Sequence, residues 1–130
     1  MRIIWKVCRK DEDGKYWSCY AGYDGSEFRA EYIPGRATTY RDNSYGFAFD
    51  TKWAAIQWAD IGVGVNDFVV LRCEGHGLKK APTHILWPEE LGSLFESFWS
   101  GQEEMGGNYA PLHTVLAKEI VPLEEVWSPD

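Results

Sequence analysis

The sequence predicts a single α+β domain built from twisted, mainly antiparallel sheets and two helices. Three observations carry this prediction. A hairpin opens the chain, the later strand-like segments do not alternate regularly with helices, and two segments have apolar residues at helical spacing. The 130 residues match the usual size of one domain and are too few for two separate cores.

The opening hairpin is predicted from two strand-like segments, residues 2–9 and 15–21, joined by a polar link that ends in Gly14. If Cys8 pairs with Tyr16, alternation along each strand defines two faces. One face is apolar and is predicted to face the core; it holds Ile3, Trp5, Val7, Trp17, Cys19 and Ala21. The other face is mixed and could be exposed; it holds Ile4, Lys6, Cys8, Tyr16, Ser18 and Tyr20.

Further strands are predicted along the rest of the chain, at residues 27–33, 46–49, 67–74, 114–117, 120–123 and 126–127. Pro34 and Gly35 end the first of them. Residues 75–82 form a basic, glycine-containing segment that is typical of a flexible loop. Pro122 lacks a backbone donor and so indicates an edge strand or a break near the end of the chain.

The first helix is predicted over residues 51–61, with Asp50 or Thr51 as its N-cap. The second is predicted over residues 88–100, because Pro88 suits a first helical position and Gly101 suits a C-cap. An apolar stripe is expected to bury this second helix, and it consists of Leu91, Leu94, Phe95, Phe98 and Trp99.

Composition and charge limit the classes of function. The formal net charge of −7 is repelled by phosphate backbones, so a nucleic-acid partner is not expected. No segment approaches the ~18 apolar residues of a membrane span, and the short apolar run at the N-terminus is unlike a signal peptide. We therefore expect a cytoplasmic protein with no membrane partner. The seven Trp, seven Tyr and six Phe exceed the needs of a small core, so some are expected to serve as surface binding anchors.

The cysteines and histidines predict neither a metal site nor a known catalytic motif. The three cysteines lack C-x-x-C spacing and are expected to be free buried thiols in a reducing compartment: Cys8, Cys19 and Cys73. The three histidines are scattered: His76, His84 and His113. A Cys–His nucleophile pair stays open, since such residues meet only in the fold.

Residues 36–45 form the strongest candidate for ligand binding, because arginines match phosphate geometry and tyrosines stack on bases or ribose. If this segment meets the polar face of the hairpin, it forms an anion-binding site of Lys6, Arg36, Thr39, Tyr40, Arg41 and Tyr45. The alternative is an ordinary polar connection, whose arginines pair with nearby carboxylates for little energy. The site would then be sought near His76, Lys79 and Lys80.

Three segments, in order, resemble the ADP-ribosyltransferase superfamily. The first is Gly46–Asp50 with the helix Thr51–Ala59, the second is the strand Phe68–Gly75, and the third is Leu112–Leu123, which is similar to the terminal strand region of poly-ADP-ribose polymerases. Together they cover about half of the chain. The resemblance implies that superfamily's twisted antiparallel scaffold and a ligand of the ADP-ribose type.

The chain departs from this family at the catalytic positions. The family's first-strand His or Arg would fall near Trp5 and Lys6, where only Lys6 offers a cation. The catalytic Glu would fall near His113 or Thr114 and is missing, and Glu119 lies further along. The resemblance therefore implies a shared scaffold that has lost transferase chemistry and holds no cofactor.

The layout also resembles small phage-encoded proteins, which have an aromatic-Lys-Val strand, a Glu-Tyr-x-x-Gly turn (here residues 31–35) and a closing Thr-Val-Leu-Ala (114–117). This resemblance implies a phage origin more than any activity. The Arg- and Tyr-rich segment 36–45, on a scaffold built for ADP-ribose-like ligands, leads to the hypothesis of a non-catalytic binding protein that acts in the host cytoplasm and neutralises a host defence system. It would sequester an anionic, nucleotide-type signal or dock on a host defence protein. The alternative hypothesis is a divergent ADP-ribosyltransferase that uses NAD, with Lys6, Tyr40 or Glu119 in unusual roles. The oligomeric state, a homo-oligomer included, stays open.

Overall fold

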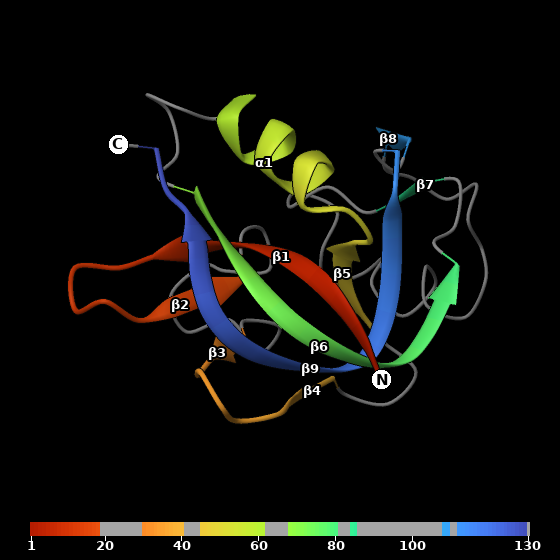
Figure 1. Ribbon diagram of the computed structural model, residues 1–130, viewed down its shortest axis with the longest axis horizontal. Helices are drawn as coiled ribbons and strands as arrows, with labels where there is room; N and C mark the ends of the chain where they lie inside the picture. Colours follow the sequence, from red (N-terminus) through yellow and green to blue (C-terminus); the bar gives the residue numbers. More distant parts are fainter. Residues whose placement is uncertain are drawn as a thin grey trace.

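The computed structural model describes residues 1–18, 30–40, 45–61, 68–80, 84–85, 108–109 and 112–129. Within these ranges the chain forms a seven-stranded sheet, a two-stranded sheet and one helix (Figure 1). The elements are β1 (Arg2–Lys10), β2 (Tyr16–Ser18), β3 (Glu31–Tyr32), β4 (Thr38–Thr39), β5 (Gly46–Phe49), α1 (Lys52–Ile61), β6 (Phe68–Lys80), β7 (His84–Ile85), β8 (Asn108–Tyr109) and β9 (Thr114–Trp127). The predicted α+β class with mainly antiparallel strands is confirmed.

The pairings of the large sheet close on themselves. β1 pairs with β6, β6 with β9, β9 with β5, and β5 returns to β1 through Trp5 and Phe49. The two longest strands, β6 and β9, lie side by side and curve together below β1 in the view of Figure 1. β2 and β3 extend the sheet beyond β1, and β4 pairs with β9. The large sheet therefore has an enclosed interior and an outer surface.

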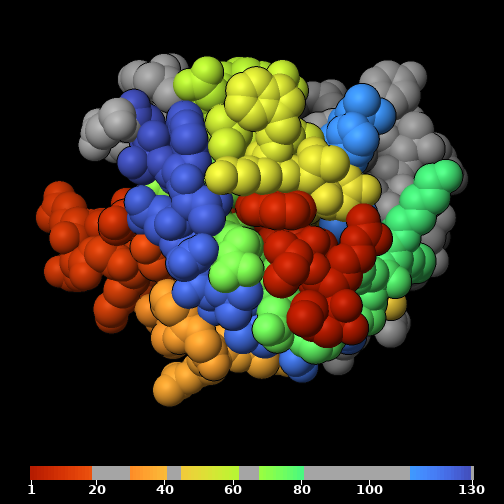
Figure 2. Space-filling model, in the orientation of Figure 1, coloured from red at the N-terminus to blue at the C-terminus, as the bar shows by residue number. Residues whose placement is uncertain are grey.

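Each side of the sheet carries its own hydrophobic core. The interior core holds Ile4, Cys8, Tyr32, Ala48, Val69, Leu71, Cys73, Ala117 and Ile120. The outer core lies under α1 and holds Val7, Phe49, Ala55, Ala59, Phe68 and Val70. In this outer core the Trp58 ring stacks on Phe68 with 5.7 Å between ring centroids. Figure 2 shows α1, in yellow, lying directly over the N-terminal strand, in red.

The expectation that one face of β1 could be exposed is wrong. Ile4 and Cys8 are fully buried, and Lys6 retains only 9% of its accessible surface. Both faces of β1 are covered because the paired strands form a closed ring. The mixed face of β1 points into the interior of this ring, and α1 covers the other face. Alternation within a strand separates two faces, but it does not say whether one of them meets solvent.

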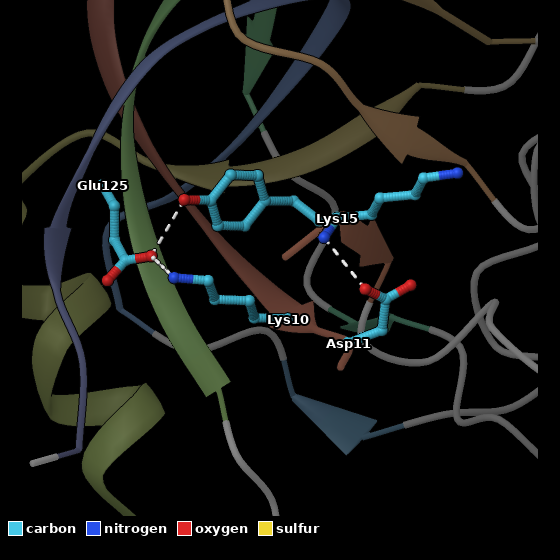
Figure 3. Close-up of polar contacts among 5 residues, drawn as sticks. Lys10, Asp11, Lys15 and Glu125 are labelled. Carbon is cyan, nitrogen blue, oxygen red and sulfur yellow. Dashed lines mark hydrogen bonds and ion pairs between the residues drawn. The ribbon is translucent and has the colours of Figure 1, made fainter. Parts of the chain in front are cut away.

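The predicted register of the hairpin is also wrong, because Cys8 pairs with Ser18 and Lys10 pairs with Tyr16. Asp11 determines this register. Its carboxylate accepts the backbone N–H groups of Asp13 and Lys15, each at 2.9 Å, and the Trp17 indole N–H at 2.8 Å. These bonds stabilise the turn between β1 and β2. The ammonium of Lys10, the last residue of β1, lies 3.0 Å from the Glu125 carboxylate of β9 (Figure 3).

The later strands are longer than predicted. β6 continues to Lys80 and absorbs most of the predicted loop 75–82, because β9 pairs with it as far as Val115. β9 likewise runs unbroken through Pro122, which sits beside a shift in register between Arg72 and Cys73. A proline is tolerated at such an irregularity, where the ladder does not need its missing donor.

The helix predicted over 51–61 is confirmed as α1, and the Thr51 hydroxyl caps it by accepting the Ala54 N–H at 3.2 Å. The helix predicted over 88–100 lies outside the described residues. Among the described helices, none is long and apolar enough to cross a membrane.

The two described cysteines, Cys8 and Cys73, are buried and form no disulfide. Burial raises the pKa of Cys73 to about 12, which keeps the thiol protonated at neutral pH. We expect that a maleimide reagent leaves both cysteines unlabelled in the native protein and labels both in urea. Peptide mass spectrometry resolves the individual sites, and rapid native labelling of either would contradict this burial.

Candidate functional site

A buried polar chain crosses the interior of the sheet. The Lys6 ammonium donates to the Phe47 carbonyl of β5 at 2.5 Å and lies 5.4 Å from the centre of the Tyr32 ring. The Tyr32 and Tyr40 hydroxyls are 2.6 Å apart. Tyr40 in turn packs against Gly46, where any added Cβ would collide with its ring. These contacts thus connect β1, β3 and β5 with Tyr40, the residue that follows β4.

Burial changes the acidity of several tyrosines. It raises the pKa of Tyr32 and raises that of Tyr40 well above its ordinary value, and the neighbouring phenol adds to the effect on Tyr40. The pKa of Tyr16 rises to about 12 because of burial and of the hydrogen bond that its hydroxyl donates to Glu125. All three phenols therefore stay protonated at neutral pH and act as hydrogen-bonding groups, not as bases.

The tyrosines predict a loss of stability in alkali. An unfolded tyrosine releases its proton near pH 10, whereas folded Tyr16 holds it until about 12. The unfolded state therefore binds fewer protons in this window, so the free energy of unfolding falls as pH rises from about 10 towards 12. Urea midpoints at pH 9 and 11 measure the fall, and Tyr16→Phe should show a smaller one. An equal fall in both proteins would exclude Tyr16 as a contributor.

A cluster of two lysines and one tyrosine lies where β5, β9 and β6 run side by side. The ammonium of Lys118 is 5.1 Å from the centre of the Tyr45 ring, and that of Lys79 is 5.4 Å from the same point. The register explains the meeting. Gly46 pairs with Ala117, which places Tyr45 beside Lys118, and β6 lies on the other edge of β9. We call these three residues the basic cluster.

Gly77 makes room for the basic cluster. It has a left-handed backbone with φ of +64°, and a Cβ at this position would approach the Lys118 Cβ to 2.8 Å. A residue with a side chain would meet both backbone strain and a close contact with Lys118. The glycine that suggests a flexible loop in the sequence is thus the feature that makes room for the start of the Lys118 side chain.

The acidity of the whole chain does not extend to the described residues. Eleven Lys and Arg residues fall in the described ranges against ten Asp and Glu residues, which gives a formal charge of +1 there and −7 for the whole chain. The described residues, which include the large sheet, therefore carry no net negative charge that would repel an anion.

The structure divides the predicted site residues between the interior and the surface. Lys6 and Tyr40 belong to the buried chain, and Tyr45 belongs to the basic cluster. Thr39 is exposed and pairs with Glu119 on β9, close along that strand to Lys118. Arg36 is exposed in the turn between β3 and β4, where its backbone N–H donates to the Ile33 carbonyl at 3.0 Å. Arg41 lies outside the described residues.

Sequence reasoning missed Lys118 and gave Lys79 only as a fallback. Lys118 stands in an apolar closing segment beside fully buried Ala117, where it gives no local sign of a site. Only the pairing of β9 with β5 brings it to Tyr45.

A second polar group lies at the start of α1. The Asp50 carboxylate is 3.1 Å from His113 Nδ1 and 3.3 Å from the Arg2 guanidinium, and its backbone N–H donates to the His113 carbonyl at 2.9 Å. His113 has a left-handed backbone with φ of +70°. The backbone bond and the His113 contact both hold the turn before β9 against the end of β5. We therefore interpret this group as one that stabilises the fold.

The geometry of the basic cluster suits an anion. Two ammonium groups beside one ring offer strong, charge-assisted donors to phosphate or carboxylate oxygens. Among the described residues, no group of three or more His, Cys, Asp or Glu side chains is arranged to hold a metal ion. Comparison with known proteins finds no matching family model, no matching curated protein and no matching solved structure.

Proposed function

We propose that this protein is a non-catalytic binding protein that holds an anionic, nucleotide-type ligand of the ADP-ribose class at the basic cluster. The observation that carries the proposal is the approach of two lysine ammonium groups to within 5.4 Å of the centre of one tyrosine ring. The two ammonium groups are of the kind that forms charge-assisted hydrogen bonds with the oxygens of an anion.

The positions of the alternative catalytic residues support binding over turnover. Lys6 is buried and donates to a backbone carbonyl. The Tyr40 hydroxyl is engaged by Tyr32, and the raised pKa of Tyr40 keeps it protonated at neutral pH. A transferase that uses NAD would need such groups free to meet its substrate.

We also propose an ADP-ribosyltransferase-like scaffold and a role in neutralising a host defence system from the host cytoplasm. The order of β5, α1 and β6 supports the scaffold, because it follows the segments that carry the resemblance. A protein that only sequesters a signal needs affinity for the ligand and no catalytic group, in keeping with the missing glutamate near His113.

Calorimetric titration with ADP-ribose tests the proposed function. We expect binding to the parent protein, and about tenfold weaker binding for Lys79→Gln and for Lys118→Gln, because each loses one charge-assisted contact. Arg36→Gln is the matched control: it also removes one exposed positive charge, and we expect less than about a twofold change.

Two results would contradict the proposal. If Arg36→Gln abolished binding while the lysine variants bound normally, the site would lie at the turn between β3 and β4. Release of nicotinamide from NAD by the parent protein, lost in Lys6→Met, would favour the transferase instead.

A further inference from the structure

We infer that two copies of this protein form a weak, two-fold symmetric dimer through the exposed face of α1, with the two α1 helices antiparallel. The inference goes beyond the proposed ligand binding and does not depend on it. It starts from the composition of α1, because only Lys52, Gln57 and Asp60 are polar among its ten residues.

The apolar residues of α1 are distributed around the whole helix. Ala55 and Ala59 are buried in the outer core. Trp53, by contrast, is 67% exposed and Ile61 is 84% exposed, and Figure 2 shows α1 at the molecular surface. Four large apolar side chains are exposed in the part of the chain that the structure describes, and α1 carries two of them. A helix that is apolar all round is normally covered on every side, so the exposed side of α1 is a candidate contact surface.

The exposed face of α1 is complementary to itself. Trp53, Gln57 and Ile61 follow one another at intervals of four residues, which places them in one stripe along the helix. At a rise of about 1.5 Å per residue, the two apolar residues lie about 6 Å on either side of Gln57 along the helix axis. A two-fold axis over Gln57 therefore places Trp53 of each copy beside Ile61 of the other. The two Gln57 amides then meet at the axis, where each can donate to the other.

The charges of α1 favour the antiparallel arrangement. Lys52 lies in the first turn and Asp60 in the last, and the helix has no acidic residue in its first turn and no basic residue in its last. This order opposes the helix macrodipole, whose positive end is the N-terminus. In an antiparallel pair the last turn of each helix lies beside the first turn of the other, so each Asp60 comes closer to a positive helix end. A second copy in this orientation thus offsets a charge pattern that is unfavourable within one chain.

The size of the contact indicates a weak dimer. A single helix stripe is smaller than the roughly 800 Å² that each partner buries in a stable complex. We therefore expect the protein to be monomeric at about 5 µM and mainly dimeric at about 500 µM.

Analytical ultracentrifugation over this concentration range tests the inference. We expect the weight-average mass to rise from that of one chain, 14.9 kDa, towards twice this value. Trp53→Lys and Ile61→Lys should each weaken the dimer by about tenfold or more, because each places an unpaired charge in the contact. Thr39→Lys is the matched control: it adds the same charge on β4, at the opposite end of the molecule from α1 in Figure 1, and should dimerise as the parent does.

Gln57→Cys tests the position of the two-fold axis. The axes of packed helices lie about 8–10 Å apart, so residues that face each other at the axis bring their Cα atoms within the range that a disulfide spans. We expect oxidation of the concentrated variant to produce a disulfide-linked dimer, seen on a non-reducing gel. Thr39→Cys, also an exposed position, should give no more cross-linked dimer than the parent protein does.

Three results would overturn the inference. The parent protein could stay monomeric at the highest concentration, which would leave the exposed face of α1 to a different partner. Unchanged dimerisation of both Trp53→Lys and Ile61→Lys, with circular dichroism showing that each is folded, would place the contact elsewhere. Equal cross-linking of Gln57→Cys and Thr39→Cys would exclude a two-fold axis at Gln57. None of these results bears on ligand binding at the basic cluster.

Discussion

Replacing Leu71 with alanine is expected to lower the free energy of unfolding by about 2–5 kcal/mol. Leu71 is fully buried in the interior core, and β6 holds it between β1 and β9, where it pairs with Lys6 and Glu125. Truncation removes apolar contacts and leaves a cavity inside a closed ring of strands, which has little freedom to collapse around it.

Urea unfolding followed by circular dichroism measures this loss. Ile61→Ala is the matched control, because Ile61 is 84% exposed at the end of α1 and should change stability by less than about 0.5 kcal/mol. If the two variants lose equal stability, the interior of the sheet is not the main core of the protein.

Replacing Gly77 with alanine is expected to cost about 1–3 kcal/mol of stability and to weaken ligand binding as well. The left-handed backbone accounts for part of the loss, and the close approach of the new Cβ to the Lys118 Cβ, 2.8 Å before relaxation, accounts for the rest. Relief of this contact must move Lys118, and with it one charge of the basic cluster.

Gly35→Ala isolates the two effects. Gly35 also has a left-handed backbone, with φ of +81°, but a Cβ there would meet nothing within 4 Å. We expect Gly35→Ala to lose stability through backbone strain alone and to keep full ligand affinity. If Gly77→Ala binds ADP-ribose as tightly as Gly35→Ala does, Lys118 is not required for binding.

Local patterns in the sequence predict the elements of this fold better than their arrangement. The helix Lys52–Ile61 follows from its N-cap and helical spacing, and the strand Gly46–Phe49 from its apolar run. The closure of the sheet could not be predicted in this way, because it depends on pairings such as Trp5 with Phe49 between distant residues. For that reason the mixed face of β1, with Lys6, appears exposed in the sequence and is buried in the structure.

In the basic cluster, too, the sequence predicts what is local and misses what depends on long-range pairing. Tyr45 can be singled out from the sequence, because the segment that ends in it concentrates donors and aromatic rings. Lys118 lies 73 positions further along the chain, and only the register of β5 with β9 brings it to Tyr45. Long-range pairing of this kind leaves no trace in local spacing, so half of the positive charge at the site is found only in the structure.

The most direct test of the basic cluster is an amide-resolved NMR titration of the isotopically labelled protein with ADP-ribose. We predict that the described amides with the largest shift changes are those of Tyr45, Gly77, Lys79 and Lys118, and that the Lys79→Gln/Lys118→Gln double variant loses these changes. The contrary result would be a set of changes centred on the turn around Arg36 or on the exposed face of α1, with the amides of the basic cluster unaffected.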